Sequence, residues 1–246
     1  MPASTWRANS TYASGVSFST ITLPAGYAVN DILLLAVLGE DVTPVGSGII
    51  SAGITNLTNN GWARVANTNT HLVGTSTQNV FMDIWWSRAA TASQTAVDIG
   101  DSGGHTLAVC SAFSNVFLLN TSADPWVDAI NISSTTATAQ VNSRNIISTT
   151  SNTLAVCLIA GPRDSAAAQI NSSPVLFNTT DEVELTERCD WGTASGTGST
   201  LGILTYRKPG VGPMANVRAN TATAQTYIVW MGALKGTIHT SQSVVV

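Results

Sequence analysis

The amino-acid sequence predicts an all-β protein, specifically an antiparallel β-sandwich of jelly-roll-like type with little or no helix. Short runs rich in β-branched and aromatic residues recur along the whole chain. Gly, Asn, Asp and Ser separate these runs, and no long stretch has the apolar period of a helix. Strands do not alternate with helices, which excludes βαβ folds. No Pro/Ser-rich linker divides the chain, so we expect one domain over residues 1–246.

The expected strands are the apolar runs between turn residues. They cover residues 16–23, 31–38, 62–67, 79–88, 95–99, 105–114, 126–131, 136–141, 152–160, 182–188, 199–207, 214–219 and 224–234. A single short helix is expected at residues 165–170, where alanines follow a proline. The two ends, about residues 1–12 and 237–246, are expected to be arms. The last three residues, Val244, Val245 and Val246, are candidates for adding a strand to a neighbouring protein.

The composition points to a protein whose surface is used for contacts with other proteins. Hydrophobic residues make up 44% of the chain, enough for a large core. Charged residues make up only 10%, with Lys208 and Lys235 as the two lysines, whereas an ordinary soluble surface is rich in charge. The net charge of −4 and the scattered arginines exclude a nucleic-acid-binding protein.

Neither secretion, membrane insertion nor metal binding is expected. The N-terminus lacks the charged and apolar regions of a signal peptide, and the longest apolar run, residues 32–38, has the length of a strand. Cys110, Cys157 and Cys189 are too widely spaced for a disulfide framework or a zinc site, so we expect buried thiols in a reducing cell. The histidines have no metal-ligand spacing. We therefore expect no metal and no cofactor.

Two strands have apolar residues on both faces. In residues 31–38, Leu33, Leu35 and Val37 lie on the face opposite Ile32, Leu34 and Leu38, and residues 224–234 place Tyr227 and Val229 opposite a second apolar set. A strand of an antiparallel sandwich normally has one wet face. These strands therefore need a second cover, which is a loop of the same chain, a neighbouring copy or another protein. The second faces are interface candidates.

The strand expected at residues 79–88 presents another candidate contact. Its even-numbered apolar residues form a core face, which puts Trp85 and Asp83 together on the outer face. An outward tryptophan is either covered by a loop or anchors a contact with a partner.

A serine-protease motif occurs at residues 100–104, Gly-Asp-Ser-Gly-Gly. Its chemistry needs a general-base histidine and an orienting aspartate beside Ser102. The upstream His71 is too close in sequence to leave room for a second barrel, and His105 follows immediately. We therefore interpret the motif as a hairpin turn between two strands, and we expect no catalytic residues.

The densest charge in the chain lies at residues 181–188. Paired carboxylates suit a glycosidase or a calcium site. However, Glu182, Glu184, Thr186 and Arg188 share one face, with Val183 and Leu185 on the other. This pattern favours a half-exposed strand whose charges protect a sheet edge.

One internal similarity is visible: the sequence Thr-Leu-Ala-Val-Cys occurs at residues 106–110 and again at 153–157. Duplication of a half-sandwich is one explanation. Because nothing on either side aligns, we favour similar packing demands on two central strands.

Several segments, taken in order, resemble a diffuse group of bacteriophage β-sandwich proteins found in head-decoration, tail-fibre and appendage proteins. The resemblance spans residues 15–130 and departs from the group at Asn115, where glycine is common. It rests on residues 23–35 (LPAGYAVNDILLL), 60–62 (NGW), 86–90 (WSRAA), 107–116 (LAVCSAFSNV) and 124–128 (DPWVD).

The resemblance implies a virion setting, with assembly in the host cytoplasm, and carries no catalytic residues. We expect a non-enzymatic head decoration (cement) or accessory surface protein that binds other virion proteins, and a homo-oligomer, with a trimer favoured because virion attachment points are commonly threefold. A tail-associated receptor- or carbohydrate-binding module, with a host glycan as partner, is the first alternative. A polysaccharide-cleaving enzyme is the second.

Overall fold

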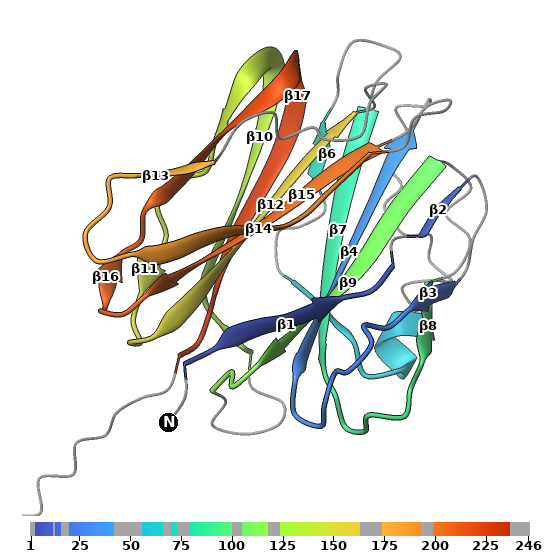
Figure 1. Cartoon of the computed structure of the whole chain (residues 1–246). Helices are drawn as coiled ribbons and strands as arrows, with labels where there is room; N and C mark the ends of the chain where they lie inside the picture. Colours follow the sequence, from blue (N-terminus) through green and yellow to red (C-terminus); the bar gives the residue numbers. More distant parts are fainter. Residues whose placement is uncertain are drawn as a thin grey trace, which may run out of the picture.

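The structure is a computed structural model that describes residues 3–11, 13–15, 20–41, 56–65, 70–72, 79–99, 105–117, 124–162, 174–192 and 199–236. Two antiparallel sheets face each other across a shared core (Figure 1). The predicted antiparallel β-sandwich is therefore confirmed.

The first sheet has the strand order β1-β9-β4-β7-β5, with β2 also paired to β9 and β6 also paired to β7. Its strands are β1 (Thr5–Asn9), β2 (Ala13–Gly15), β4 (Ile32–Asp41), β5 (Ala63–Arg64), β6 (Thr70–Leu72), β7 (Asn79–Arg88) and β9 (His105–Ser114).

The second sheet has the order β10-β17-β12-β15-β14, with β13 also paired to β17. Its strands are β10 (Trp126–Asn142), β12 (Thr153–Pro162), β13 (Val175–Phe177), β14 (Val183–Gly192), β15 (Ser199–Lys208) and β17 (Asn216–Leu234). The edge strand β14 is irregular, because its register with β15 shifts twice and Glu184 has a positive φ of 63°.

Each sheet is built from one half of the chain. Every described strand of the first sheet comes from residues 5–114, and every described strand of the second from residues 126–234. This connectivity differs from that of a jelly roll, in which successive strands pass between the two sheets. The chain completes one layer before it starts the other.

Two small two-stranded sheets lie on the outer sides of the sandwich. β3 (Thr20–Thr22) pairs with β8 (Ala96–Asp98), and β11 (Ile147–Ser148) pairs with β16 (Gly212–Pro213). A helical turn at residues 56–59 accompanies the first pair. Figure 1 shows β3 and β8 beyond the first sheet, and β11 and β16 beyond the second.

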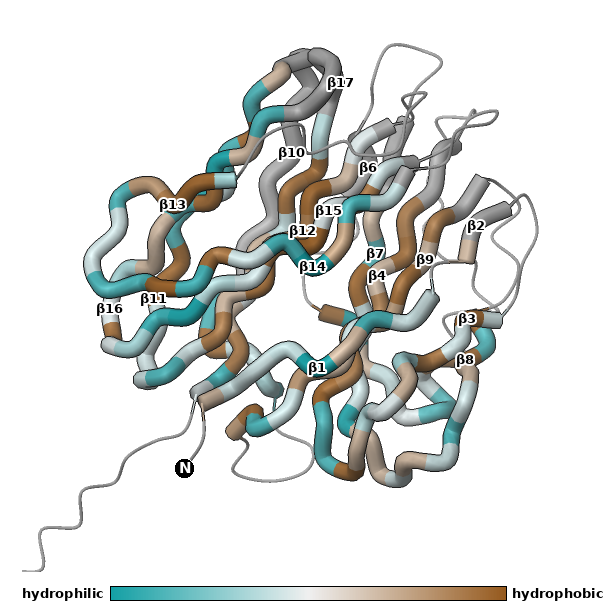
Figure 2. The backbone as a smooth tube through the Cα atoms, in the orientation of Figure 1, coloured by the Kyte–Doolittle hydropathy of each residue, from teal (hydrophilic) through white to brown (hydrophobic). Residues whose placement is uncertain are grey.

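Three apolar clusters fill the spaces that these layers create. The central cluster lies between the sheets and includes Leu34 of β4 and Val156 of β12. A second cluster packs the outer face of the first sheet against Ile21 and Val97 of the β3–β8 pair, and a third packs the second sheet against Ile146 and neighbouring residues. The most apolar stretches in Figure 2 accordingly follow the central strands of both sheets. Each sheet is thus covered on both faces.

The sequence predicted the long central strands best. The bounds of β7 and β9 match the prediction, whereas the two strands expected at residues 126–131 and 136–141 are one strand, β10. The stretches expected as separate strands at 214–219 and 224–234 lie largely within the single strand β17. The expectation of an N-terminal arm was wrong for residues 5–9, which form β1 and pair with β9. The helix expected at 165–170 lies outside the described residues.

Gly232 occupies a position in β17 that has no room for a side chain. A Cβ atom there would lie 2.3 Å from the Trp230 ring and 3.0 Å from the Trp126 ring. These two rings make an edge-on contact, with centroids 5.0 Å apart. We expect Gly232→Ala to lower the free energy of unfolding by about 1–3 kcal/mol, because overpacked cores must shift side chains or backbone.

Chemical denaturation would measure this effect, with Trp230→Leu as the second background. If the two rings set the cost, Gly232→Ala should be less harmful once Trp230 is shortened. An equal cost in both backgrounds would contradict this explanation.

Candidate functional site: an interaction surface

Trp85 and Asp83 do not form an exposed contact, so the prediction for this pair was wrong. Trp85 is 2% exposed and Asp83 is fully buried. Arg64 of β5 donates two hydrogen bonds to the Asp83 carboxylate, at 2.7 and 3.0 Å, and its guanidinium carbon lies 5.8 Å from the centroid of the Trp85 ring. A charge-assisted bidentate pair of this kind compensates a buried carboxylate. Because the chain supplies its own arginine here, no partner is needed.

The remaining described interface candidates are also buried within the chain. Leu33, Leu35 and Val37 belong to the cluster beneath the β3–β8 pair, and Tyr227 and Val229 belong to the cluster beneath β11 and β16. The sequence left three possible covers for these apolar faces: a loop of the same chain, a neighbouring copy or another protein. In the structure, segments of the same chain cover them. These five side chains are therefore not available to a partner in this fold. The other candidates, Val244, Val245 and Val246, lie outside the described residues.

The interpretation of residues 100–104 as a hairpin turn needs correction. Those residues lie outside the described part of the chain, but the strands on either side are described. β8 pairs with β3, whereas β9 pairs with β1, β2 and β4. The described strands that precede and follow the motif therefore belong to different sheets and do not pair with each other, contrary to the expected hairpin.

Two carboxylates of the acidic stretch form a structural cluster with Lys208. The Lys208 Nζ donates to Asp181 Oδ1 at 2.5 Å and to Glu182 Oε1 at 3.3 Å. Lys208 is 2% exposed, and the Glu182 side chain is fully buried. Backbone N–H groups of Thr180, Gly210 and Ala215 donate to the same carboxylates. With these partners in place, the cluster ties the segment before β14 to the turn after β15.

These contacts shift the pKa values of all three groups in the direction that favours the charged form of each group. Hydrogen bonding from Lys208 lowers the pKa of Asp181. Burial opposes the ionisation of Glu182, but hydrogen bonds from the Thr180 backbone and from Lys208 outweigh it and lower the pKa of that carboxyl. Burial likewise opposes the charge on Lys208, yet its two carboxylate partners raise its pKa. A general acid needs a raised carboxyl pKa, so this pair does not suit glycosidase chemistry.

The cysteines, the possible metal ligands and the surface hollow of the described residues give no further candidate for chemistry. The three cysteines are buried and unbridged; burial raises the pKa of Cys157 to about 12 and raises those of Cys110 and Cys189 as well. No group of three metal-ligating side chains occurs among the described residues. A surface hollow between residues 22–27 and 92–95 is lined by uncharged residues, and its Tyr27 hydroxyl donates to the Gln94 carbonyl at 2.6 Å.

The exposed large apolar side chains of the described residues belong mostly to the second half of the chain, on β13 and around the β11–β16 pair. Among the described residues, six large apolar side chains are exposed, and only Val29 belongs to the first half of the chain. We define the β13 patch as Val175 and Phe177 of β13, Ile147 of β11 and Val211 beside β16; these are 50%, 46%, 57% and 66% exposed. Val183 at the start of β14 is exposed as well.

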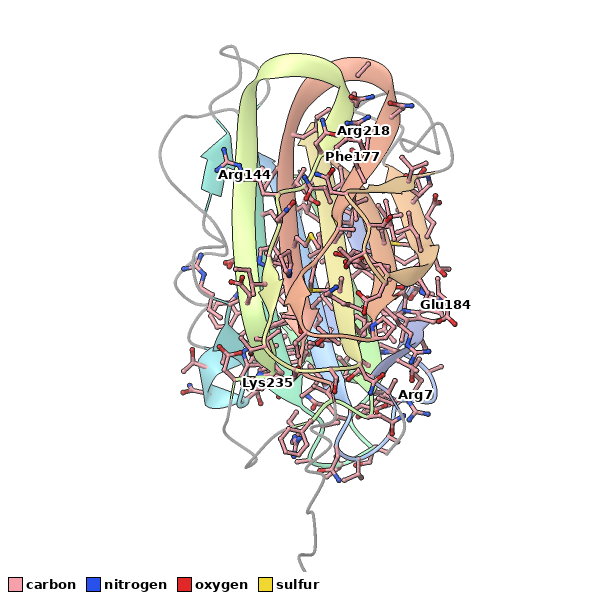
Figure 3. All side chains as sticks on the ribbon, turned by 90° about the vertical axis from the view of Figure 1, so that its left-hand side faces the viewer. Arg7, Arg144, Phe177, Glu184, Arg218 and Lys235 are labelled. Carbon is pink, nitrogen blue, oxygen red and sulfur yellow. The ribbon has the colours of Figure 1, made fainter. Side chains whose placement is uncertain are left out.

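Arginine accompanies the aromatic residue of the β13 patch. The guanidinium carbon of Arg218 lies 4.4 Å from the centroid of the Phe177 ring, and Figure 3 shows both residues on the face turned toward the viewer. Arg144 is exposed and also lies on this side of the molecule (Figure 3). Aromatic residues and arginine are enriched in protein–protein interfaces.

The first half of the chain buries the apolar side chains between its central strand β4 and the edge strand β5. There, the helical turn at residues 56–59 places Leu57 in the core, followed by buried Trp62. In the second half, between β12 and β14, β13 leaves Val175 and Phe177 exposed. Sequence reasoning missed β13 because three apolar residues are too few to give a strand signal. Their position after Pro174 and before Asn178 was the one available hint.

Comparisons with known proteins found no matching family model, no matching curated protein and no matching solved structure. In the part of the chain that the structure describes, no helix has the length and apolar character to cross a membrane.

The Lys208 cluster yields a prediction on stability and its pH dependence. Lys208→Met would leave Glu182 buried without its cation, and losing one partner of a buried pair costs about 3–5 kcal/mol. Both carboxyl pKa values are lowered in the folded protein, so their contribution is present above the ordinary carboxyl pKa of about 4 and is lost as the pH falls through the folded values. The deficit of the variant should therefore be large at neutral pH and shrink in acid.

Urea denaturation across this pH range would measure the deficit. Lys235→Met provides the matched control, because the Lys235 Nζ donates to the Asp124 carbonyl and takes part in no ion pair among the described residues. We expect the control to cost less than about 1 kcal/mol. A Lys208→Met deficit that does not change with pH would refute the ionic explanation.

Proposed function

We propose that this chain is a non-enzymatic structural protein of a bacteriophage virion, which acts through contacts with other virion proteins. The observation that carries the proposal is the β13 patch, a group of exposed apolar side chains, whereas most large apolar side chains of the described residues are buried within the protein's own layers. Exposed apolar groups rimmed by polar residues mark protein interaction sites.

The distribution of charge supports a contact protein more than an enzyme. Charged residues are 10% of the chain, and the most buried described carboxylates, Asp83 and Glu182, are bound to Arg64 and Lys208. Asp31, 3% exposed, is bound to Arg7 at 2.6 Å. Carboxylates committed to such pairs serve the fold, because catalytic carboxyl groups must reach a substrate.

Within the virion, a head decoration or accessory surface protein is the form we propose. The resemblance to phage β-sandwich proteins supports the virion setting, and the exposed β13 patch suits a protein that attaches through its surface. The tail-associated, glycan-binding alternative loses Trp85 as a candidate stacking platform, because its ring is buried.

Antibody labelling tests this location. Antibodies raised against the recombinant chain would be applied to particles from cells infected with a phage that encodes it. We expect regular label on heads in electron micrographs. Label confined to tails would favour the receptor-binding alternative, and complete absence from purified particles would refute the virion role.

The β13 patch can be tested by paired substitutions. We expect Val175→Ser combined with Phe177→Ser to reduce the amount of the chain on purified particles, while the unfolding temperature stays close to that of the wild type, because both side chains are half exposed. Val29→Ser, at an equally exposed apolar position in the first half, is the matched control. Unchanged occupancy of the double variant would exclude this patch as the attachment surface.

A further inference from the structure

The two sheets share one strand order, although their sequences show no alignment. If the five main strands of each half are numbered along the chain, their order across the sheet is 1-5-2-4-3 in both halves. The second strand is therefore the central one in each sheet. The corresponding strands are β1, β4, β5, β7 and β9 in the first half and β10, β12, β14, β15 and β17 in the second.

The side layers repeat this correspondence. β3 lies in sequence between the first and central strands, and its partner β8 lies between the two strands that flank the centre. β11 and β16 occupy the same two places in the second half and also pair antiparallel. The repetition therefore includes the outer cover as well as the sheet.

The strand registers also agree at single residues. Ile32 at the start of β4 lies between Arg88 and Phe113 of the flanking strands. Leu154 in β12 lies between Arg207 and Leu234. The Nε atoms of both arginines are buried. An apolar residue flanked by an arginine and a large apolar residue thus recurs at the same point of each sheet.

Asparagine with a positive φ precedes the central strand in both halves. Asn30 and Asn152 have φ values of 72° and 55°, and each lies two residues before the apolar residue just described. The Asn30 N–H donates to the Ala89 carbonyl at 2.8 Å, and the Asn152 N–H donates to the Pro209 carbonyl at 2.9 Å. Each acceptor follows the corresponding flanking strand of its half, β7 or β15. Asparagine is among the few non-glycine residues that tolerate this backbone conformation.

Tryptophan and a β-bulge mark the first strand of each half. Trp6 pairs with Phe113, and the register then shifts before Ala8. Trp126 pairs with Leu234, and the register shifts before Asp128. A bulge inserts one residue at a defined place and is retained as a feature of a fold.

The halves face each other with approximate two-fold symmetry. β4 lies opposite β15, and β12 lies opposite β7. Because β4 corresponds to β12 and β7 to β15, a two-fold rotation exchanges these two contacts. Edge β1 meets β14, where Asn9 Nδ2 donates to the Arg188 carbonyl at 3.0 Å and the Arg188 guanidinium lies over the Trp6 ring. The corresponding edge β10 lies beside β6. A two-fold interface uses the same surface of both partners.

We infer that the chain is a tandem duplication of one sheet unit, residues 3–117 and 124–236, and that the inner face of each unit is a two-fold interface whose partner is another copy of the same unit. Strand order, side layers, register, backbone conformation and bulge position agree independently. The sequence similarity between residues 106–110 and 153–157 does not belong to this correspondence, because it relates β9 to β12. The inference is independent of the virion role.

The interface has the composition of a permanent contact. Its central cluster draws apolar residues from both units, including Leu34, Ile84 and Phe113 from the first and Val156, Ile203 and Trp230 from the second. A single unit would expose this face to water, so each unit depends on the other. The start of the first unit lies beside the ends of both units, since Ser4 Oγ donates to the carbonyls of Asn115 and Lys235, at 3.1 and 3.0 Å.

Cleavage of the intact protein between the units tests the inference. A specific protease site would be inserted between residues 120 and 121 of the full chain, and the folded protein would be cut there. We expect the two fragments to remain a 1:1 complex in native mass spectrometry. After unfolding in guanidinium and dilution, they should re-form the same complex with the same circular dichroism and tryptophan fluorescence.

A cut within a unit is the matched control. The same site would be placed in the exposed turn at residues 90–93, between β7 and β8. This cut puts β9 on a different fragment from its partner β4 and from β7, which also pairs with β4. We expect this control to recover several-fold less folded complex than the cut between units. Equal recovery of the two cut proteins would overturn the inference, as would fragments of the first protein that separate into folded monomers.

Discussion

The fold depends on covering two sheets that are apolar on both faces. A sheet with one wet face needs a single partner layer, but β4 and β12 carry buried apolar residues on both of their faces. The facing sheet covers the inner side, and short segments of the same half, with β3–β8 or β11–β16, cover the outer side. Burial of apolar area on four sheet faces supplies the main stabilising contribution, because it grows with the area removed from water. The arrangement leaves the protein with a large core and few exposed apolar groups.

The sequence carries enough information for the central strands and not for their surroundings. Long runs rich in apolar and aromatic residues, such as residues 79–88 and 105–114, predicted β7 and β9 with correct bounds, since period and length both favour strands. Alternation along β7 correctly separated Trp85 and Asp83 from the inner face. It could not reveal that Arg64, distant in sequence, neutralises Asp83, or that Trp85 is buried in the outer apolar cluster. Such cover is a tertiary property, and a period in one strand does not encode it.

The acidic stretch and the repeated architecture show two other limits. The edge position expected for residues 182–188 agrees with β14 as an edge strand among the described strands, but Glu182 is buried because Lys208 arrives from β15. The duplication left almost no trace in the sequence, because corresponding positions share burial and backbone conformation more than chemical identity. Trp85, for example, corresponds to Leu204, and Asp31 to Thr153. Only strand pairing brings such positions into correspondence.

The double irregularity of β14 has a consequence for crowded particles. Many copies fixed side by side would place sheet edges at high local concentration, where regular edges join into continuous fibrils. With its backbone in the left-handed region at Glu184 and its pairing with β15 shifted twice, β14 presents an irregular edge, which is a poorer template for an incoming strand than a regular edge. Dense display of this protein is therefore compatible with individual, unfused subunits.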